Sequence, residues 1–205
     1  MFRKAKETLH LMSLSKHRET YPVNEIFYSL QGEGYWTGTP ALFIRFSGCN
    51  LRCPFCDTDF KDHTMMTVDA IMEIVTASPA PIVVLTGGEP SLQPLEPLLL
   101  ELGKSGKRIH IETNGTNPLP ENIDWVTLSP KTGFTICLDR WDELKIVYTG
   151  ENPIEQWGEL IKATDPHALF LQPCSGKNIP QTVSFILDNP VFRLSLQTHK
   201  TLNIR

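Results

Sequence analysis

The sequence predicts an α/β protein, built as a partial, open βα barrel of about six parallel strands. The first observation is a series of short apolar runs separated by Gly, Pro and polar turns. The second is that helical patterns fit between several of these runs, and such alternation is typical of βα units. The third is length, because 205 residues hold too few units for a closed barrel of eight strands. In such folds the active site lies at the C-terminal ends of the strands.

The expected strands show little alternation of apolar and polar residues, as in strands covered on both faces. They are residues 41–46, 82–85, 108–111, 125–128, 144–148 and 168–171. A helix is expected at residues 68–77, where Thr67 precedes the pattern as a suitable N-cap. Weaker helical patterns, interrupted by prolines, cover residues 92–104, 153–163 and 179–187.

Residues 21–205 are expected to form a single domain, because no linker, repeat or low-complexity segment divides them. Residues 1–20 are expected to be a mobile N-terminal extension. They carry five basic side chains but no apolar stretch as long as that of a signal peptide. The chain has five cysteines, and this odd number argues against a closed disulfide framework. We therefore expect a cytoplasmic protein with free thiols.

Composition argues against two kinds of partner. Nineteen Lys and Arg against 23 Asp and Glu give a formal net charge of −4, so no broad basic surface for nucleic acid is expected. The longest apolar runs, such as residues 81–85 and 98–100, are far shorter than the roughly 20 residues that cross a membrane. The content of 40% hydrophobic and 20% charged residues is typical of a globular chain with a buried core.

Three cysteines lie close together. Cys49, Cys53 and Cys56 form a C-x3-C-x2-C pattern after the first expected strand. Thiolate ligands select zinc or an iron–sulfur cluster. A structural zinc site usually takes paired Cys or His ligands, and no second pair is evident here. The spacing therefore favours a cluster with one iron left open over zinc, without excluding zinc. Cys137 and Cys174 are isolated and are expected to be buried core residues.

A second motif, TGGEP at residues 86–90, follows the expected strand at residues 82–85. Two glycines at a strand end allow the backbone to approach a ligand closely, and a carboxylate beside them can meet an ammonium group. Alone, this motif is most often an ordinary βα turn. In combination with the cysteine motif about thirty residues earlier, the chain resembles the radical S-adenosylmethionine (SAM) superfamily.

This resemblance implies the fold of that superfamily and one 4Fe–4S cluster per chain, held by the three close cysteines. The open iron would bind the amino and carboxylate groups of SAM, and the TGGEP strand end would hold the ammonium. Polar groups at other expected strand ends fit the same pocket, and Phe55 could stack on the adenine or cover the cluster. The residues expected to bind SAM are Phe55, Gly88, Glu89, Glu112, Asn114, Ser129, Pro130, Lys131, Gln172, Pro173, Cys174 and Ser175.

Further segments narrow the resemblance. They are YPVNEIF at residues 21–27, SLQGEG at 29–34, FIRF at 43–46, DT at 57–58 and QTHK at 197–200. With these segments the chain resembles, over nearly all of residues 21–205, the 7-carboxy-7-deazaguanine synthases. These are radical SAM enzymes of queuosine and deazapurine biosynthesis.

The resemblance implies a lyase-type ring contraction that converts 6-carboxy-5,6,7,8-tetrahydropterin into 7-carboxy-7-deazaguanine with loss of ammonia. SAM would be regenerated in each cycle and thus act as a cofactor. An external one-electron donor, a flavodoxin, would reduce the cluster, and Mg²⁺ would assist. The family also implies a homodimer.

By the same resemblance, the backbone and side chains of residues 30–32 would read the edge of the pterin. Arg45 would pair with the substrate carboxylate, since its planar fork suits bidentate binding; a structural ion pair with an acidic neighbour is the alternative. Thr58 matches a position that helps to hold Mg²⁺. The C-terminal carboxylate of Arg205 would accept N–H bonds from the ring. The residues expected to bind the substrate are Leu30, Gln31, Gly32, Arg45, Thr86 and Arg205.

Some alternatives remain open at this point. Glu25 and Glu33 could face the pterin, although acids exposed to solvent are the simpler interpretation. An activase that makes a glycyl radical on a partner protein would share the cysteine and Gly-Gly-Glu-Pro motifs, but it has no reason to carry the other segments. A zinc-held interaction module without catalysis would be distinguished by metal analysis.

Overall fold

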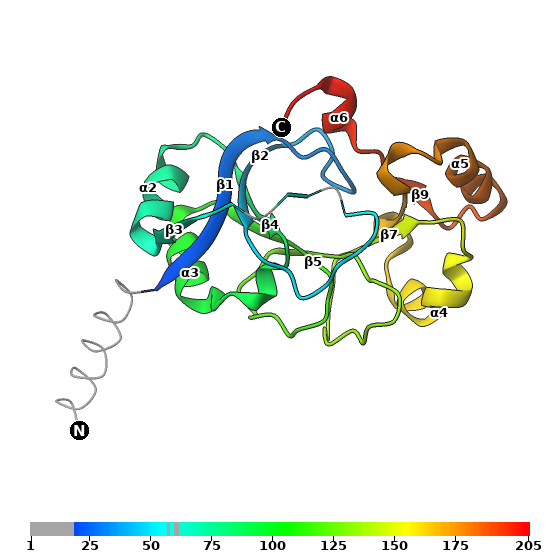
Figure 1. The fold of residues 1–205 in the computed structure, drawn as a ribbon, viewed down its shortest axis with the longest axis horizontal. Helices are drawn as coiled ribbons and strands as arrows, with labels where there is room; N and C mark the ends of the chain where they lie inside the picture. Colours follow the sequence, from blue (N-terminus) through cyan, green and yellow to red (C-terminus); the bar gives the residue numbers. More distant parts are fainter. Residues whose placement is uncertain (1–18, 57, 60–61) are drawn as a thin grey trace.

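The structure is a computed structural model that describes residues 19–56, 58–59 and 62–205. One curved β-sheet forms the centre of the molecule, and helices cover its outer face (Figure 1). Most of the expected N-terminal extension, residues 1–18, lies outside the described residues, as does Asp57 of the DT segment. Within the described part of the chain, no helix is both long enough and apolar enough to span a membrane.

The sheet of the described residues has nine strands in the order β3-β1-β2-β4-β5-β6-β7-β8-β9. Each neighbouring pair from β2 to β9 is parallel, whereas β1 is antiparallel to both β2 and β3. Because β3 and β9 are edges in this order, the barrel is open. The strands are β1 (Thr20–Leu30), β2 (Pro40–Phe46), β3 (Thr64–Thr67), β4 (Ile82–Gly87), β5 (Arg108–Thr113), β6 (Trp125–Leu128), β7 (Glu143–Tyr148), β8 (Leu169–Pro173) and β9 (Arg193–Leu194).

The helices follow the strands in the βα manner that the sequence predicts. As expected, the hydroxyl of Thr67 caps the first of them and accepts the N–H of Ala70 at 3.2 Å. The helices are α2 (Val68–Ala77), η1 (Pro90–Leu92), α3 (Leu95–Leu102), η2 (Gly103–Ser105), α4 (Pro153–Ala163), η3 (Pro166–Ala168), η4 (Cys174–Gly176), α5 (Ile179–Asp188) and α6 (Thr198–Leu202).

The predicted fold class is confirmed, with corrections at the edges of the sheet. The six expected strands correspond to β2 and to β4 through β8. Strands β1, β3 and β9 were not expected. β1 lacks a continuous apolar run, since Pro22, Asn24 and Glu25 interrupt it and much of it is only half-buried. The helix expected at residues 92–104 begins only at Leu95, because Pro94 stands at its N-cap.

Two apolar cores attach the helices to the sheet. Under α2 and α3, Ile71 and Leu98 pack with Leu85 of β4. Under α4 and α5, Leu144 of β7 and Leu171 of β8 are fully buried. Successive side chains of a strand point to opposite faces, so neighbouring residues of the same strands point into the barrel. On that inner face Ala41, Phe43, Ile82 and Val84 form a third buried cluster, which leaves the C-terminal strand ends to form a site.

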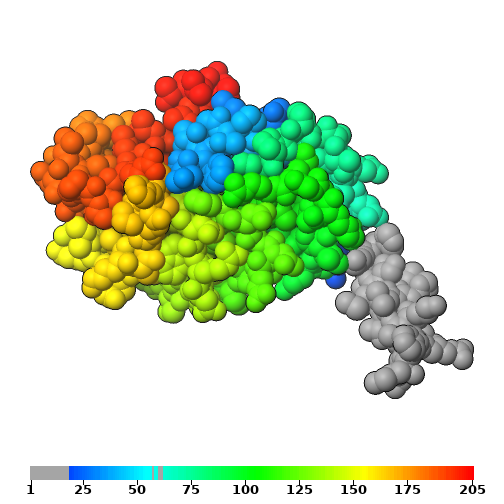
Figure 2. Space-filling model, turned by 180° about the vertical axis from the view of Figure 1, so that it is seen from behind, coloured from blue at the N-terminus to red at the C-terminus, as the bar shows by residue number. Residues whose placement is uncertain are grey.

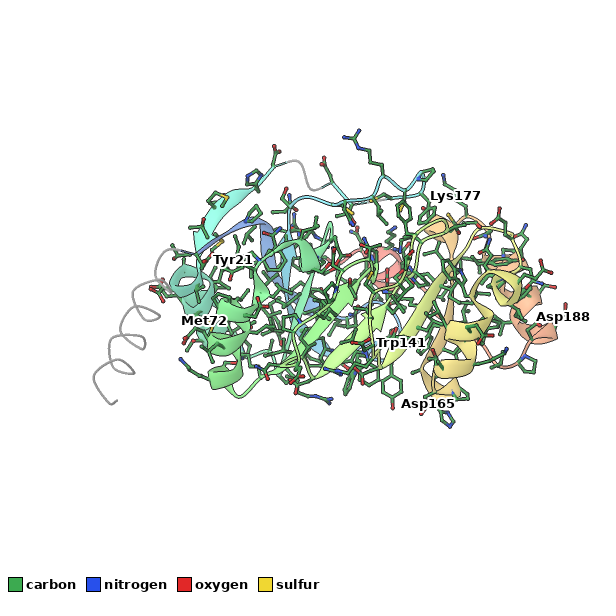
Figure 3. All side chains as sticks on the ribbon, turned by 90° about the horizontal axis from the view of Figure 1, so that it is seen from below. Tyr21, Met72, Trp141, Asp165, Lys177 and Asp188 are labelled. Carbon is green, nitrogen blue, oxygen red and sulfur yellow. The ribbon has the colours of Figure 1, made fainter. Side chains whose placement is uncertain are left out.

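The C-terminal ends of the parallel strands lie on one side of the molecule. Asp165 precedes β8 and Lys177 follows it, and the two lie at opposite sides of the strand layer in Figure 3. The loop that carries the cysteines passes over the side on which Lys177 lies (Figure 3). The C-terminal segment, red in Figure 2, packs against the segment that follows β1, where the backbone and hydroxyl of Thr198 both donate to the carbonyl of Gly32 at 2.9 Å.

Candidate active site

A cavity of about 420 Å³ opens at the C-terminal ends of the strands. It brings together nearly all the residues that the sequence singles out, although they come from segments far apart in the chain. Those that line it are Leu30, Gln31, Gly32, Arg45, Cys49, Cys53, Phe55, Cys56, Thr58, Thr86, Gly88, Glu89, Glu112, Asn114, Ser129, Lys131, Gln172, Pro173, Ser175 and Arg205. Pro130 and Cys174 are not among the lining residues.

The start of the cysteine loop is bonded directly to the end of β4. Glu89 N–H donates to the carbonyl of Gly48 at 2.9 Å, and Gly88 N–H donates to that of Phe46 at 3.0 Å. A Cβ on Gly88 would lie 1.9 Å from the Gly48 oxygen, so only glycine allows this approach. The two motifs that carry the superfamily resemblance thus form one structural unit.

The three close cysteines line the cavity, and the Cys56 N–H donates to the Cys53 carbonyl at 3.1 Å in a tight turn. As they stand, no three His, Cys, Asp or Glu side chains in the described residues are arranged to hold a metal ion. The thiols must therefore turn toward a common point to bind a cluster. Burial, together with Glu89 and the other two thiols, raises the pKa of Cys49, and a bound metal centre would favour its thiolate form.

The other two cysteines differ from expectation. Cys137 is exposed, so its assignment to the core is wrong. It lies in the loop between β6 and β7, where its backbone N–H donates to the Gly115 carbonyl and its side chain faces solvent. Cys174 is half-buried, and its backbone N–H donates to the Asn178 side chain at 2.8 Å. It is neither a fully buried core residue nor a residue that lines the cavity.

Glu89 is buried, with 1% of its surface exposed, and its carboxylate joins the ends of two strands. Its Oε1 accepts from the Ser91 N–H, the Ser91 hydroxyl and the Thr113 hydroxyl at 2.7–3.0 Å. Its Oε2 accepts the Asn114 N–H at 2.7 Å. Sequence reasoning assigned Glu89 to an ammonium group and did not foresee these bonds. The carboxylate thus joins the β4 and β5 ends in the absence of a ligand.

Amide side chains attach the cysteine loop to the end of β5. Asn114 Nδ2 donates to Asn50 Oδ1 at 3.0 Å, and Asn50 Nδ2 donates to the Thr116 hydroxyl at 2.7 Å. The Thr116 N–H in turn donates to Asn114 Oδ1 at 2.9 Å. The loop is therefore fixed from two strands, β4 through its backbone and β5 through side chains.

Opposite this attachment, Lys131 follows β6 and donates to the Ser129 carbonyl at 2.5 Å and to the Ser129 hydroxyl at 2.8 Å. Burial lowers the pKa of Lys131 below its usual range, although the nearby Cys53 thiol opposes the effect. Beyond β8, the Ser175 hydroxyl donates to the carbonyl of Phe55 at 3.4 Å. These groups enclose the cysteine side of the cavity.

The far side of the cavity holds a buried charge cluster that includes a residue missed by sequence reasoning. Lys145 of β7 forms ion pairs with Glu33 at 2.5 Å and with Glu112 at 3.5 Å. Its side chain is only 5% exposed. The signal in the sequence was a single charged residue within the apolar run LKIVY, which was interpreted only as a strand. Glu33 lines the cavity, so the simpler interpretation of a solvated acid is wrong.

Arg45 also lines the cavity but already has a protein partner. Its Nε donates to Glu25 Oε1 at 2.9 Å, and its guanidinium lies 5.7 Å from the centre of the Phe27 ring. The side chain of Arg205 pairs with the other oxygen of Glu25, and an oxygen of its C-terminal carboxylate, which was expected to meet the pterin ring, accepts from the Ser29 hydroxyl. The structural ion pair considered as the alternative for Arg45 is thus present, and the end of the chain reaches the mouth of the cavity.

Comparison with known proteins agrees with this geometry. The profile of the Radical SAM superfamily matches residues 43–163. A 7-carboxy-7-deazaguanine synthase from Bacteroides thetaiotaomicron is 56% identical over 183 residues, which cover 89% of this chain and 98% of the relative. The synthase of the same name from Synechocystis is 39% identical over 91% of this chain and 94% of its own length.

The fold has a match among solved structures as well. The crystal structure of QueE from Escherichia coli superposes with a TM-score of 0.75 and 31% sequence identity. The match covers 89% of this chain and 96% of that chain. Sequence and structure comparisons therefore point to the same group of proteins.

Proposed function

Since this chain belongs to the radical SAM superfamily and, within it, to the 7-carboxy-7-deazaguanine synthases, we propose that it converts 6-carboxy-5,6,7,8-tetrahydropterin into 7-carboxy-7-deazaguanine. The reaction releases ammonia and supplies queuosine and deazapurine biosynthesis. The observation that carries the proposal is a single cavity lined by the three cysteines, the Gly88–Glu89 strand end and the Leu30–Gly32 segment.

The donor set fits a 4Fe–4S cluster and SAM. Three thiols on one loop line the cavity, and the loop is anchored beside the strand end that would meet the SAM ammonium. When bound, the cluster and SAM would supply an electron and a carbon-centred radical that removes a hydrogen atom from the pterin. Asn114, Ser129 and Lys131 would hold the polar parts of SAM, and Phe55 would cover its adenine or the cluster.

The protein's own task is to place the reacting carbon and to exclude groups that quench a radical. The Gln31 side chain and the backbone beside it would read the ring edge of the pterin. The carboxylate of the pterin would pair with the guanidinium of Arg45, which already binds one anion, Glu25. Thr86 and Arg205 would line the substrate side of the cavity. Thr58 would contribute a hydroxyl to a hydrated Mg²⁺.

The partners form part of the proposal. A one-electron reductant, of the flavodoxin type, would act from outside the cavity, and the active unit would be a homodimer in the cytoplasm. Five free cysteines are consistent with a reducing compartment.

The test is turnover by the full chain after anaerobic reconstitution with iron and sulfide. Carboxytetrahydropterin, SAM, Mg²⁺ and dithionite are supplied, and the product is identified by mass spectrometry. We expect the deazaguanine acid to accumulate while SAM is not consumed in proportion. An intact cluster with no deazaguanine product would refute the synthase assignment, and one zinc per chain without iron would favour a zinc-held module.

A further inference from the structure

Lys145 is the centre of a buried ring of side chains at the substrate side of the cavity. Its ammonium contacts Glu33 Oε2 and Glu112 Oε2, which come from the segment after β1 and from β5. The second oxygen of Glu112 accepts the Gln31 Nε2–H at 2.9 Å, and Gln31 Oε1 accepts the Glu33 N–H at 3.2 Å. The ring is therefore closed, from Lys145 through both acids and Gln31 back to Lys145.

The ring fixes Gln31 in one orientation. A flipped amide would place its NH₂ against the Glu33 N–H and its oxygen against a carboxylate oxygen, so both bonds would be lost. The backbone of Gln31 is fixed as well, since its N–H donates to the Thr39 carbonyl at 2.8 Å and its carbonyl accepts from Gly38 at 2.7 Å. Only the side chain of Gln31 depends on the Lys145 ring.

The C-terminal segment is attached to the same ring. Gln197 Nε2 donates to Glu33 Oε1 at 2.9 Å, and Lys200 donates to Gln197 Oε1 at 2.8 Å. A Cβ on Gly32 would lie 2.2 Å from His199 Nδ1, so this segment packs closely on the loop beside Gln31. Movement of Glu33 would therefore disturb two walls of the cavity.

The charge of Lys145 is needed to keep the two acids in place. Burial alone would raise the pKa of Glu33, but the Lys145 ammonium and its hydrogen bond lower it below its usual range. The pKa of Lys145 is in turn raised, because Glu112 and Glu33 outweigh its burial. Without the ammonium, two carboxylates would share a buried site, and at least one would take up a proton or move toward water.

We propose that Lys145 is a positioning residue for the pterin: by bridging Glu33 and Glu112 it fixes the Gln31 side chain and the adjoining wall of the substrate site. It acts through these residues, and its one contact with a residue expected to bind SAM is the longer bond to Glu112. This inference rests on the proposed function, because it assigns the ring to the substrate of that reaction. Its expected signature is a larger loss of pterin binding than of SAM binding.

The experiment compares Lys145→Met, Lys145→Arg and the charge-balanced double variant Lys145→Met/Glu33→Gln in the reconstituted enzyme. Pterin and SAM affinities are measured separately by anaerobic calorimetry, alongside KM, kcat and iron content. The matched control is Lys107→Met, which removes a lysine that donates to the Ser78 and Ala80 carbonyls outside the cavity.

We expect Lys145→Met to raise the KM and the dissociation constant for the pterin by about tenfold or more. The SAM affinity should fall clearly less than the pterin affinity, because among the residues expected to bind SAM Glu112 is the one that Lys145 contacts, whereas Asn114, Ser129 and Lys131 lie toward the cysteines. Lys145→Arg should recover most of the pterin affinity because it keeps the charge. If Lys145→Met does not fold, the double variant decides, since it leaves only Glu112, a more exposed carboxylate than Glu33, without its cation and should still bind the pterin weakly.

Wild-type pterin affinity in the folded double variant would overturn the proposal, as would equal changes in pterin and SAM affinity in Lys145→Met. The proposal would also be overturned if Lys107→Met and Lys145→Met changed the KM for the pterin to the same extent. Absence of turnover in the wild-type enzyme is a different result, because it refutes the proposed function itself.

Discussion

The backbone N–H of Glu89 donates to the carbonyl of Gly48 at 2.9 Å, and this bond joins the end of β4 to the residue before Cys49. The distance between the cysteine loop and the Gly-Gly-Glu strand end is therefore set by backbone atoms, without any side chain between them. Close packing of this kind depends on Gly88, whose neighbours leave no room for a methyl group.

Gly88→Ala should unfold or expand this junction. Its Cβ would lie 1.9 Å from the Gly48 oxygen and 2.5 Å from the Gly48 carbonyl carbon, and backbone atoms cannot rotate away as a side chain can. We expect a loss of more than about 2 kcal/mol in the free energy of unfolding, measured with urea, and poor retention of iron. Gly103→Ala is the control, because Gly103 has helical backbone angles and open space around it. Equal effects of the two substitutions would contradict this reasoning.

Glu89→Gln tests whether this carboxylate is structural before any ligand binds. Four donors converge on its two oxygens, and an amide would set an NH₂ group against at least one of them. We expect the free energy of unfolding of the cluster-free protein to fall by about 1–3 kcal/mol. Glu73→Gln, on the exposed face of α2, should leave it unchanged. A cluster-free Glu89→Gln protein as stable as the wild type would show that the carboxylate serves only a ligand.

Cys53→Ala should abolish both the cluster and turnover, because two thiolates do not hold a 4Fe–4S cluster with one open iron. The exposed Cys137 lies outside the cavity and provides the matched control, so Cys137→Ala should keep the full iron content and activity. Iron and sulfide analysis and the visible absorbance of the anaerobic protein measure the effect. A fully loaded, active Cys53→Ala enzyme would refute the ligand assignment.

Thr58→Val tests the proposed magnesium site. Valine keeps the shape of threonine but has no oxygen, so Mg²⁺ would lose a ligand while the cavity keeps its volume. We expect the stimulation of turnover by Mg²⁺ to weaken, with more Mg²⁺ required for half of the maximal rate, and Thr58→Ser to retain it. An unchanged dependence on Mg²⁺ in Thr58→Val would place the ion elsewhere.

The fold was largely predictable because β2 and β4 through β8 are covered on both faces and thus carry continuous apolar runs. β1 was not predictable in this way. One of its neighbours is the short edge strand β3, and its register shifts between Val23 and Glu25, so its polar residues break the pattern. An extended strand of this kind is stabilised by pairing with β2, which is information that the local sequence does not hold.

The lining of the cavity was predictable where it comes from contiguous motifs, such as residues 86–89 after β4 and Glu112 to Asn114 at the end of β5. It was not predictable where residues distant in the chain share a hydrogen bond. Lys145 and Glu33 are 112 positions apart, and only the closure of the sheet brings them together. For the same reason the sequence did not identify which acid pairs with Arg45.

Glu143 is expected to make the free energy of unfolding depend on pH. It is 2% exposed at the start of β7, where its Oε2 accepts the Tyr35 N–H and the Trp125 Nε1–H, each at 3.2 Å. Burial raises its pKa from the usual 4.5 to about 7, against the opposing effect of Lys145. Between these two values the folded chain keeps a proton that the unfolded chain releases. The free energy of unfolding should therefore fall as pH rises across this window, by up to about 1.4 kcal/mol per pH unit.

Glu143→Gln isolates this contribution, since glutamine keeps a carbonyl oxygen to accept both bonds but does not ionise. We expect the wild type to lose stability relative to the variant as pH rises from 5 to about 7, and the difference to level off above that point. This difference in the free energy of unfolding is measured by urea unfolding of the two cluster-free proteins at half-unit pH steps. Subtracting the value of the variant from that of the wild type cancels the contribution of groups that titrate in both. A difference that stays constant from pH 5 to about 8 would mean that Glu143 is ionised throughout in the folded chain, and that its two donors and Lys145 outweigh its burial.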